Sequence, residues 1–456
     1  MMQDPYTMLS GSKTTSTDIC RWAQALFLLH ERIATRFARL EPRRRVLSYL
    51  QGILSETARK NGWQLAEFAG EEHPHGMQRL LSQAVWDTHG VRDDVRSYVI
   101  EHLGHEHAVL AIDETSFPKR GRKSAGVGWQ YCGTTGQIEN CQIGVFLSYI
   151  TTKGHALIDR ELYLPLDWCE NADRRRSAHI PAEVRFQTKP ELAAQMIERI
   201  QHAGIPIDWV VADTVYGSNV DLRNWLEHHH YHYVMAVACT EPVAFQTHEG
   251  RARIEACLIE TRIPDQIQWQ RISMCEGTKG PRLFDWAVVP LLHRWEDDGC
   301  HFLLIRRSIA DPLEKCYYVV FASPFTPLST MVAAIGCRWR IEEDFENGKD
   351  MGLDHYEVRC FLGWYRHITL VMLAAAYLAG IVATEKTQML SAVLPPASSH
   401  AFPLIPVTIP EVRHLLGRLI WPIPRNMKRV LHWSRWRRCH QSRARYFHAK
   451  YHRDVG

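Results

Sequence analysis

Several features that would place the chain in a familiar class are missing. Its twelve cysteines are scattered singly and none forms a Cys-x-x-Cys pair, which argues against a disulfide framework and favours free thiols in a reducing compartment. The first twenty residues are polar, with no basic stretch followed by an apolar one, so no secretory signal is expected. The longest apolar run, Ile368 to Ala383, is about 16 residues, shorter than the roughly 18 to 20 that span a bilayer. We therefore expect a cytoplasmic protein in which this run is a buried helix.

One histidine-rich run, from Glu227 to His232, invites a metal-binding interpretation because imidazole is a common ligand. No second cluster with zinc spacing accompanies it in the sequence. We therefore interpret the run as the exposed end of a helix before a strand. A zinc or cysteine hydrolase is not expected, because neither ligand clusters nor an obvious Cys/His pairing is present.

The net charge of +4 hides a strong division along the chain. Residues 411–456 hold 12 Lys or Arg against Glu411 and Asp454, a net of +10, which leaves −6 on the other 410 residues. A basic tail on a mildly acidic body favours contact with a polyanion such as nucleic acid. Solvated surface charge is the alternative explanation.

The length of 456 residues and the 46% hydrophobic content allow a large core and two or three domains. Apolar residues from about 16 to 104 recur at helical spacing, which predicts a helical N-terminal region. Within it, Asn61-Gly62 separates two helical segments, and a DNA-binding helix-turn-helix is one interpretation. Helix pairs joined in this way are also common in proteins that do not bind DNA.

The middle of the chain is predicted to form a sheet. Continuous apolar runs at 108–112 and 209–212 indicate buried strands, and the segment 128–164 is typical of an antiparallel meander. An amphipathic helix is predicted at 189–202, before the second of these runs. Strands that alternate with helices after an antiparallel start predict an α/β fold with a mixed sheet covered by helices.

The later part of the chain changes character twice. Strand-like segments from about 241 to 323 predict a β-rich insertion. Helical periodicity then runs from Thr326 to about Thr384, with a break near Gly352, and predicts a long helix that ends the core. The segment 395–399 is a linker by composition, and the basic tail follows it.

Two aspartates are placed where an α/β sheet presents functional side chains. Asp113 and Asp213 each follow a predicted buried strand, and strand ends of this kind face a crevice. If the two strands are neighbours, the two carboxylates repel each other unless a cation lies between them. Mg²⁺ suits such an all-oxygen site.

A third carboxylate is expected from the helical stretch 338–349. At roughly 100° per residue, Glu342 lies about 40° from Arg338, and Lys349 lies about 20° from Glu342, so the three share one face. Ile341 and Phe345 flank that face and would pack it toward the sheet. Three carboxylates can hold two metal ions for an in-line phosphoryl displacement, with Arg338 and Lys349 on the phosphate. An ordinary salt-bridge network on a surface helix fits the spacing equally well.

The motifs resemble those of a known family. Arg338, Glu342 and Lys349 match the Arg-x3-Glu-x6-Lys core of bacterial insertion-sequence transposases of the DDE class. Asp113-Glu114-Thr115 is similar to the first aspartate motif of that superfamily, and the segment 211–217 is similar to the second. The likeness runs from Val109 to Ala383, about 60% of the chain. It departs from the family at Ile335, where a tyrosine that contacts phosphate or a flipped base is usual.

The resemblance implies an α/β fold with an RNase H-like mixed sheet flanked by helices and split by a β-rich insertion. The domains expected on this basis are a helical N-terminal, DNA-binding domain at 1–105, a catalytic core at 106–240 and 324–390, the insertion at 241–323, and a linker with a basic DNA-contacting region at 391–456.

It also implies a DNA transposase. Asp113, Asp213 and Glu342 would hold two Mg²⁺ ions, with Mn²⁺ as the alternative, for cleavage at transposon ends by water and transfer of the 3′-hydroxyl to target DNA. The expected partners are double-stranded DNA and a second copy of the chain, in the bacterial cytoplasm at the nucleoid. The alternatives are a metal-dependent endonuclease without strand transfer and an inactive, transposase-derived DNA-binding repressor.

Basic residues are the predicted DNA contacts. In the tail, Arg residues interleave with aromatic ones, so guanidinium groups can neutralise phosphates while rings stack on bases. A packed terminal helix with solvated cations is the alternative. The full set of predicted DNA-contacting residues is Arg338, Lys349, Lys119, Arg120, Arg435, Arg437 and Arg438.

Some relatives open DNA through a hairpin intermediate, in which an aromatic residue of the insertion stacks on a flipped base. Trp269, Trp286 and Trp295 are the candidates for that role here. Packing within the insertion is the alternative for each of them.

Overall fold

The chain is organised as two compact units. The computed structural model describes residues 14–277, 280–391, 405–423 and 426–454. One unit combines Met1–Asp94 with Asn347–Gly456, and the other is Val95–Glu346. Helices α5 (Thr88–Leu103) and α13 (Trp339–Asp350) run across the division. The linker expected at 395–399 lies outside the described residues, and the four domains expected from the sequence stay a prediction.

The first unit is helical in its described residues. Helix α1 begins with a capping box, in which Thr15 and Asp18 satisfy each other's backbone N–H groups. Helix α14 is long and apolar enough to cross a membrane, but 89% of its most apolar window is buried, as in the core helix of a soluble protein. The expectation of a buried helix at Ile368 to Ala383 is therefore confirmed. The elements of this unit are α1 (Ser16–Ile33), η1 (Ala34–Arg36), α2 (Leu40–Leu54), α3 (Gly62–Ala69), α4 (His75–Ser82), α14 (Phe361–Ser391), α15 (Ile409–Leu419) and α16 (Met427–Asp454).

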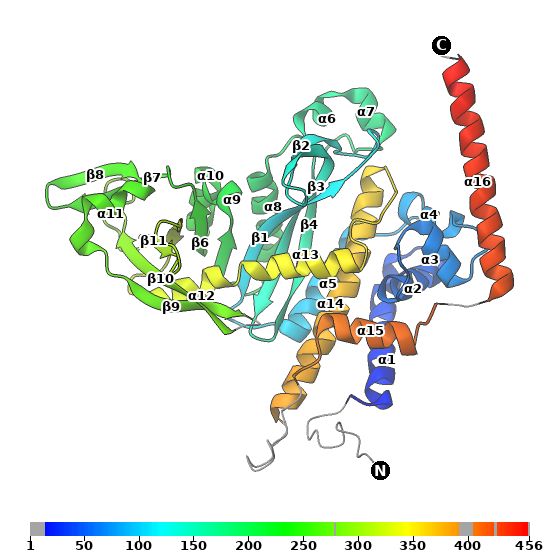
Figure 1. Cartoon of the computed structure of the whole chain (residues 1–456), viewed down its shortest axis with the longest axis horizontal. Coiled ribbons are helices and arrows are strands. Elements are labelled where there is room, and N and C mark those ends of the chain that lie inside the picture. Colours follow the sequence, from blue (N-terminus) through cyan, green and yellow to red (C-terminus); the bar gives the residue numbers. More distant parts are fainter. Residues whose placement is uncertain (1–13, 278–279, 392–404, 424–425, 455–456) are drawn as a thin grey trace. The chain divides into compact units, whose positions relative to one another are not determined.

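The second unit is built on a mixed sheet (Figure 1). Along most of the sheet the strand order is β2-β3-β1-β5-β6-β12-β11-β10-β9, and β4 also pairs with β3. The strands are β1 (Val109–Pro118), β2 (Gly128–Cys132), β3 (Gln137–Thr151), β4 (Gly154–Tyr163), β5 (Trp209–Ala212), β6 (His232–Val237), β9 (Gln270–Gly277), β10 (Gly280–Pro290), β11 (His301–Arg307) and β12 (Lys315–Phe321). A separate hairpin joins β7 (Pro242–Thr247) to β8 (Gly250–Glu255).

Helices connect and cover these strands. They are α6 (Leu166–Glu170), α7 (Ala172–Ser177), α8 (Lys189–His202), α9 (Thr214–Gly217), α10 (Val220–His228), η2 (Ala256–Leu258), α11 (Ile259–Arg262), η3 (Pro264–Gln266) and α12 (Leu328–Gly336). The predicted helix at 189–202 is confirmed as α8, which begins with a capping box between Thr188 and Glu191.

The strand order gives the core its RNase H-like character. Strands β1, β3 and β4 form an antiparallel meander, β5 adds in parallel beside β1, and β6 adds in parallel beside β5. Parallel neighbours need crossover connections, which α8 and α10 provide. The prediction of a mixed sheet flanked by helices is confirmed.

The strand-rich segment after β6 extends the same sheet. Strand β12 pairs antiparallel with β6, and β11, β10 and β9 follow in turn. Residues far apart in sequence therefore lie on adjacent strands, as with Val320 and Val234.

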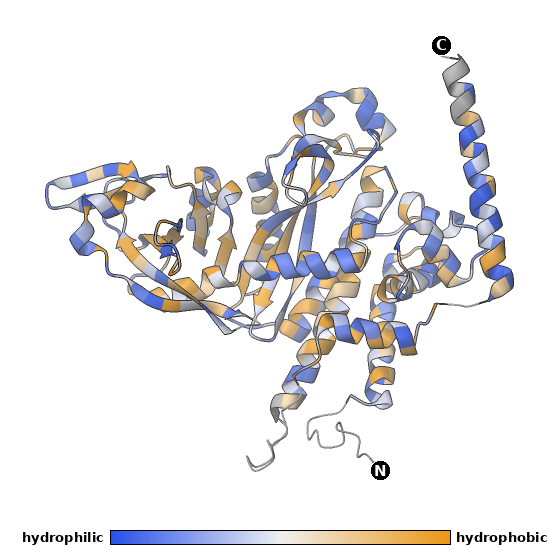
Figure 2. Cartoon of the chain, in the orientation of Figure 1, coloured by the Kyte–Doolittle hydropathy of each residue, from blue (hydrophilic) through white to orange (hydrophobic). Residues whose placement is uncertain are grey.

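Helices α8 and α13 cover opposite faces of the meander. On β3, Phe146 and Ser148 contact Phe345 and Asp344 of α13. The alternate residues Val145 and Leu147 pair with Glu161 and Asp159 of β4, which bind Arg199 of α8. The core strands are mainly hydrophobic, whereas α13 exposes a hydrophilic stripe (Figure 2).

Two local expectations need correction. Asp113 does not end its strand, because β1 continues to Pro118 in antiparallel pairing with β3; only the parallel pairing with β5 ends at Ile112. The helical stretch after Thr326 is three helices, α12, α13 and α14, instead of one with a single break. Arg338 therefore lies in the turn that precedes α13.

Candidate active site

The sheet brings Asp113 and Asp213 together. Strands β1 and β5 pair in parallel, and Ile112 opposite Ala212 is their last registered pair. Asp113 and Asp213 are the next residues on the two strands, and both side chains are partly buried. The sequence-based expectation that they are neighbours is confirmed by this register.

Asp213 is held by the helix that follows it. Its carboxylate oxygen Oδ1 accepts a hydrogen bond from the backbone N–H of Val215 at 3.0 Å, which caps the short helix α9. Gly217 ends that helix close to β6, where an added Cβ would lie 1.9 Å from a backbone oxygen. Close approach of the α9 turn to the sheet thus requires glycine at this position.

Helix α13 carries Glu342, and two neighbouring residues of the helix anchor it to the sheet. Asp344 is 5% exposed and binds Ser148 Oγ at 2.5 Å and His155 Nδ1 at 2.9 Å. Phe345 packs edge-to-face on Phe146, with ring centroids 5.4 Å apart. Because Phe146 is also the cross-strand partner of Asp113, this packing sets α13 on the same face as Asp113.

Arg338 joins the strand carboxylate to the helix carboxylate. Its guanidinium lies 3.3 Å from Asp113 Oδ2 and 2.9 Å from Glu342 Oε1. Its side chain is 18% exposed, and that of Glu342 is 38% exposed. Two members of the charged face predicted from helical spacing, Arg338 and Glu342, therefore pair with each other, and Arg338 also contacts Asp113. Lys349 lies in the last turn of α13, within the first unit.

The site holds its carboxylates in unfavourable surroundings. The pKa of Asp113 is raised to about 7, mainly by burial. The negative charges of Asp213 and Glu114 also raise it, whereas the positive charge of Arg338 lowers it. Burial and then the charge of Glu114 also raise the pKa of Asp213. Crowded, desolvated carboxylates of this kind are stabilised by a cation. The all-oxygen donors of Asp113, Asp213 and Glu342 fit Mg²⁺ or Mn²⁺.

Glu114 is a charged neighbour of the aspartates to which the sequence analysis gave no separate role. It follows Asp113 on β1, so its side chain leaves the opposite face of the strand. There it accepts a hydrogen bond from Tyr216 Oη at 2.6 Å and pairs with Lys189 Nζ at 2.5 Å. Burial, and then Glu114, raise the pKa of Tyr216 well above its usual value, which keeps the phenol protonated as a donor. The neighbouring Asp-Glu pair in the sequence was the available signal.

The basic loop after β1 lies beside an exposed aromatic strand. Lys119 and Arg120 begin this loop, and Asn140 of β3 binds the backbone of the loop at Lys119 and Gly121. Opposite Asn140 is Trp129, which is 72% exposed, and Tyr131 two residues on is 64% exposed. Their alternation on a short strand was the signal that the sequence offered for this surface.

The predicted tail contacts lie on α16, in the first unit. Trp433 is buried and donates its indole N–H to the Glu71 carbonyl at 3.2 Å, which fixes the start of the helix on the neighbouring helical segment. Arg437 pairs with Glu67 at 2.7 Å, whereas Arg435 and Arg438 are exposed. Part of the tail's charge is thus used within its own unit.

The aromatic candidates of the insertion differ in exposure. Trp286 is fully buried and packs against Tyr318, so the packing interpretation holds for it. Trp295 is 47% exposed, and the ring of Trp269 lies 3.9 Å from the guanidinium of Arg307. Ile335, at the position where the family usually has tyrosine, is 3% exposed on α12.

Fold and site together define a protein of the RNase H-like class with a carboxylate cluster suited to divalent cations. The family described as DDE superfamily endonuclease matches residues 33–281, more than half of the chain, and the family described as transposase DDE domain matches residues 187–379. The chain belongs to the DDE superfamily of endonucleases. The resemblance found in the motifs is thereby confirmed.

A curated relative extends this result. The chain is 26% identical over 187 residues to a protein described as a probable transposase for insertion sequence element IS701 of Microchaete diplosiphon. The match covers 41% of this chain and 46% of that protein, so the chain matches about half of the relative's length.

Two solved structures show weaker likenesses, each at 10% identity. A piggyBac transposase synaptic complex with hairpin DNA gives a TM-score of 0.38, covering 82% of this chain and 68% of that one. The NurA nuclease from Sulfolobus solfataricus gives 0.23, covering 55% and 80%. Scores this low do not establish a shared fold.

Proposed function

We propose that this protein is a DNA transposase that cleaves DNA at the ends of its element and joins the freed 3′-hydroxyl to target DNA. The observation that carries the proposal is that Asp213 follows the strand beside Asp113, while Arg338 contacts both Asp113 and Glu342. A module that only binds DNA has no use for two desolvated aspartates with a third carboxylate joined to them by an arginine.

The chain's own residues prepare the site for phosphoryl transfer. When bound, two divalent ions would activate the attacking oxygen and stabilise the leaving oxygen. Asp113 and Asp213 are fixed by β1, β5 and the cap of α9, and Glu342 is positioned by the anchoring of α13 at Asp344. Arg338 holds Glu342 toward the aspartates and supplies a guanidinium able to bind phosphate bidentately.

The DNA would be bound by surfaces on both units. Near β1, Lys119 and Arg120 supply cations beside the exposed rings of Trp129 and Tyr131, and this combination suits a displaced or distorted strand. On the other unit, Arg435 and Arg438 of α16 suit the phosphate backbone. Lys349 and Arg437 are proposed as further DNA contacts. A dimer on DNA follows from the need to hold two ends, and the cytoplasm of a bacterium, at the nucleoid, is the proposed location.

The proposal is tested by cleavage of DNA carrying the element's own ends in the presence of Mg²⁺ or Mn²⁺. Asp113→Ala, Asp213→Ala and Glu342→Gln should each lose at least about a thousandfold in rate, because the ions supply several kcal/mol of transition-state stabilisation. Glu346→Gln is the matched control, since Glu346 is exposed one turn further along α13. Full activity in any of the three variants would remove that residue from the site.

Arg338 is tested by a pair of substitutions. Arg338→Lys keeps one charge and Arg338→Ala keeps none, so a bidentate role predicts that both lose activity and that lysine restores only a part. DNA binding without divalent ions should be nearly unchanged in Arg338→Ala. Equal activity of the Lys variant and the wild type would contradict the bidentate role.

A strand-transfer assay with supercoiled target DNA separates the proposed function from its alternatives. Joined products establish a transposase. Cleavage without joining identifies an endonuclease, and specific binding without cleavage identifies a repressor.

A further inference from the structure

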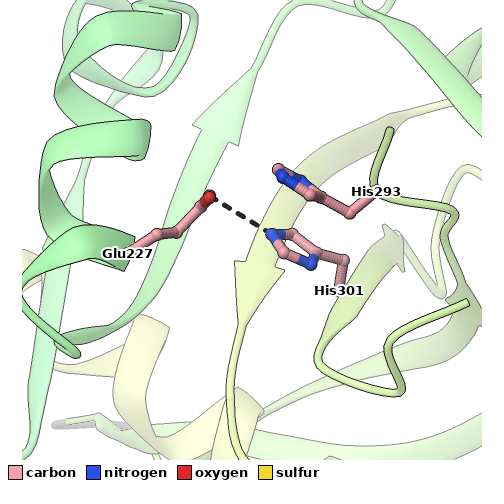
Figure 3. A group of neighbouring side chains, drawn as sticks. All are labelled: Glu227, His293 and His301. Atoms are coloured by element: carbon pink, nitrogen blue, oxygen red, sulfur yellow. Dashed lines mark ion pairs between the residues drawn. The ribbon is translucent and has the colours of Figure 1, made fainter. Parts of the chain in front are cut away.

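Away from the carboxylate cluster, Glu227 meets two histidines that are remote from it in sequence (Figure 3). Glu227 lies near the end of α10, His293 in the loop after β10, and His301 begins β11. One ligand atom from each lies within 4.8 Å of the others, a spacing at which three side chains could hold a metal ion. The run 227–232 is the end of a helix before a strand, as the sequence predicted, with His228 and His230 exposed, but Glu227 itself is only 16% exposed.

The contact between Glu227 and His301 has an unusual geometry. Glu227 Oε1 lies 3.2 Å from His301 Nε2, yet Nε2 is buried and has no hydrogen-bond partner. The oxygen therefore lies off the direction in which Nε2 would donate. In a tetrahedral zinc site with bonds near 2.0 Å, two ligand atoms lie about 3.3 Å apart and both point at the ion. The observed separation matches that arrangement.

The other ring nitrogen of His301 is already oriented. Asp298 Oδ2 lies 2.7 Å from His301 Nδ1, so Nδ1 can donate to this carboxylate, and in the neutral ring Nε2 then carries the lone pair that a metal ion needs. Tyr233 Oη donates to Glu227 Oε1 at 2.7 Å. A carboxylate behind a ligating histidine and a hydroxyl behind a ligating carboxylate are the supports that metal ligands usually have.

The second histidine lies face to face with the first. The rings of His293 and His301 are 4.4 Å apart at an interplanar angle of 15°. The nitrogen lone pair of each imidazole lies in its ring plane, so two nearly parallel rings bind one cation only when one of the rings turns toward it. In Figure 3 the side chain of Glu227 points toward both rings.

We propose that Glu227, His293 and His301 form a zinc site, with water as the fourth ligand. Two imidazole nitrogens and one carboxylate suit Zn²⁺, whereas the all-oxygen cluster at Asp113 suits Mg²⁺. The site cross-links α10 of the core to β11 and to the loop before it. It thereby fastens the strands added after β6 to α10, the second helix after Asp213.

The test measures zinc in the full-length protein after dialysis against zinc-buffered solution. Wild type should hold one zinc per chain, and a double variant, His293→Gln with His301→Gln, should hold none. Asp298→Asn should weaken zinc binding by about 10- to 100-fold while the three ligands remain, as loss of a supporting carboxylate does. Added zinc should raise the melting temperature of the wild type but not of the double variant.

Two controls exclude other sites. His228→Gln changes a neighbouring histidine of the same run and should leave zinc content unchanged. Asp113→Ala with Asp213→Ala should also retain one zinc, which separates this site from the proposed catalytic cluster. Equal zinc content in the wild type and the double histidine variant would overturn the proposal, and so would loss of zinc in the double aspartate variant alone.

Discussion

The ionised carboxylate of Asp113 should destabilise the metal-free protein, and this effect should grow as the pH rises and more of the group is ionised. Burial and the charges of Asp213 and Glu114 raise its pKa from 3.8 to about 7. A shift of about 3 units corresponds to up to about 4 kcal/mol of preference for the protonated form in the folded state. Because the pKa of Asp113 is raised on folding, the contribution of its protonated carboxyl group to the free energy of unfolding is fully present below pH 3.8. That contribution is lost as the pH rises through about 7.

Replacing Asp113 by Asn removes the titration while keeping the shape. The amide oxygen can still accept the hydrogen bond that the Glu114 N–H donates at 2.7 Å. The gain in stability should be about 1.5 kcal/mol near pH 5 and about 4 kcal/mol near pH 8. The difference of 2 to 3 kcal/mol corresponds to roughly 5 °C in melting temperature for a unit of this size. The same variant should be inactive in DNA cleavage.

The measurement is thermal unfolding in excess chelator at both pH values for the wild type, Asp113→Asn and Asp173→Asn. Asp173 is a control because its side chain is 89% exposed, and its pair with Arg176 is expected to add little to stability. Added Mg²⁺ should then raise the melting temperature of the wild type more than that of Asp113→Asn. An equal difference at both pH values, or a variant less stable near pH 8, would refute this account of the site.

Three further substitutions test the supports of the site. His155→Ala should lower stability by about 3 kcal/mol, because it leaves Asp344 buried with a weaker set of partners. Burial lowers the pKa of His155, but the carboxylates of Asp344 and a neighbouring glutamate raise it to about 9, so the loss should be largest below pH 6.5 and fade as the pH rises through 9 in chemical unfolding. Gly217→Ala should lower the melting temperature strongly, since its Cβ would meet a backbone oxygen of β6 at 1.9 Å, whereas Gly133→Ala, with nothing within 4 Å, should change it little. Trp129→Ala should weaken binding to single-stranded DNA by about 1 to 3 kcal/mol without changing the melting temperature; unchanged affinity in filter binding would count against a stacking surface on β2.

Local patterns in the sequence were enough to place the two aspartates. The runs 108–112 and 209–212 are continuously apolar because both strands are buried on two faces of a sheet, and such runs are recognisable without a structure. The carboxylates that follow them are neighbours because the two strands are parallel. What the runs could not show is that β1 continues for five residues past Asp113, since its later half is stabilised by pairing with β3.

Non-local pairing accounts for most of what the sequence left open. The insertion strands were expected as a β-rich segment, but their addition to the edge of the core at β6 depends on contacts such as that of Val320 with Val234. The surroundings of Glu227 were left open for the same reason, because His293 and His301, which lie near it, are more than sixty positions away. Periodicity predicts which elements form, and it carries little information on which elements meet.

Arg338 makes one contact that depends on local helical spacing and one that depends on non-local pairing. Its contact with Glu342 is an i,i+4 pair that helical spacing predicts directly, and the structure has it at 2.9 Å. Its contact with Asp113 spans 225 positions and depends on Phe345 and Asp344 holding α13 against β3. The guanidinium therefore contacts the carboxylates of Asp113 and Glu342, whereas the sequence predicted a contact with phosphate. The two positions are compatible if divalent ions take over the charge of the carboxylates, because Arg338 is then released to bind the phosphate of the DNA.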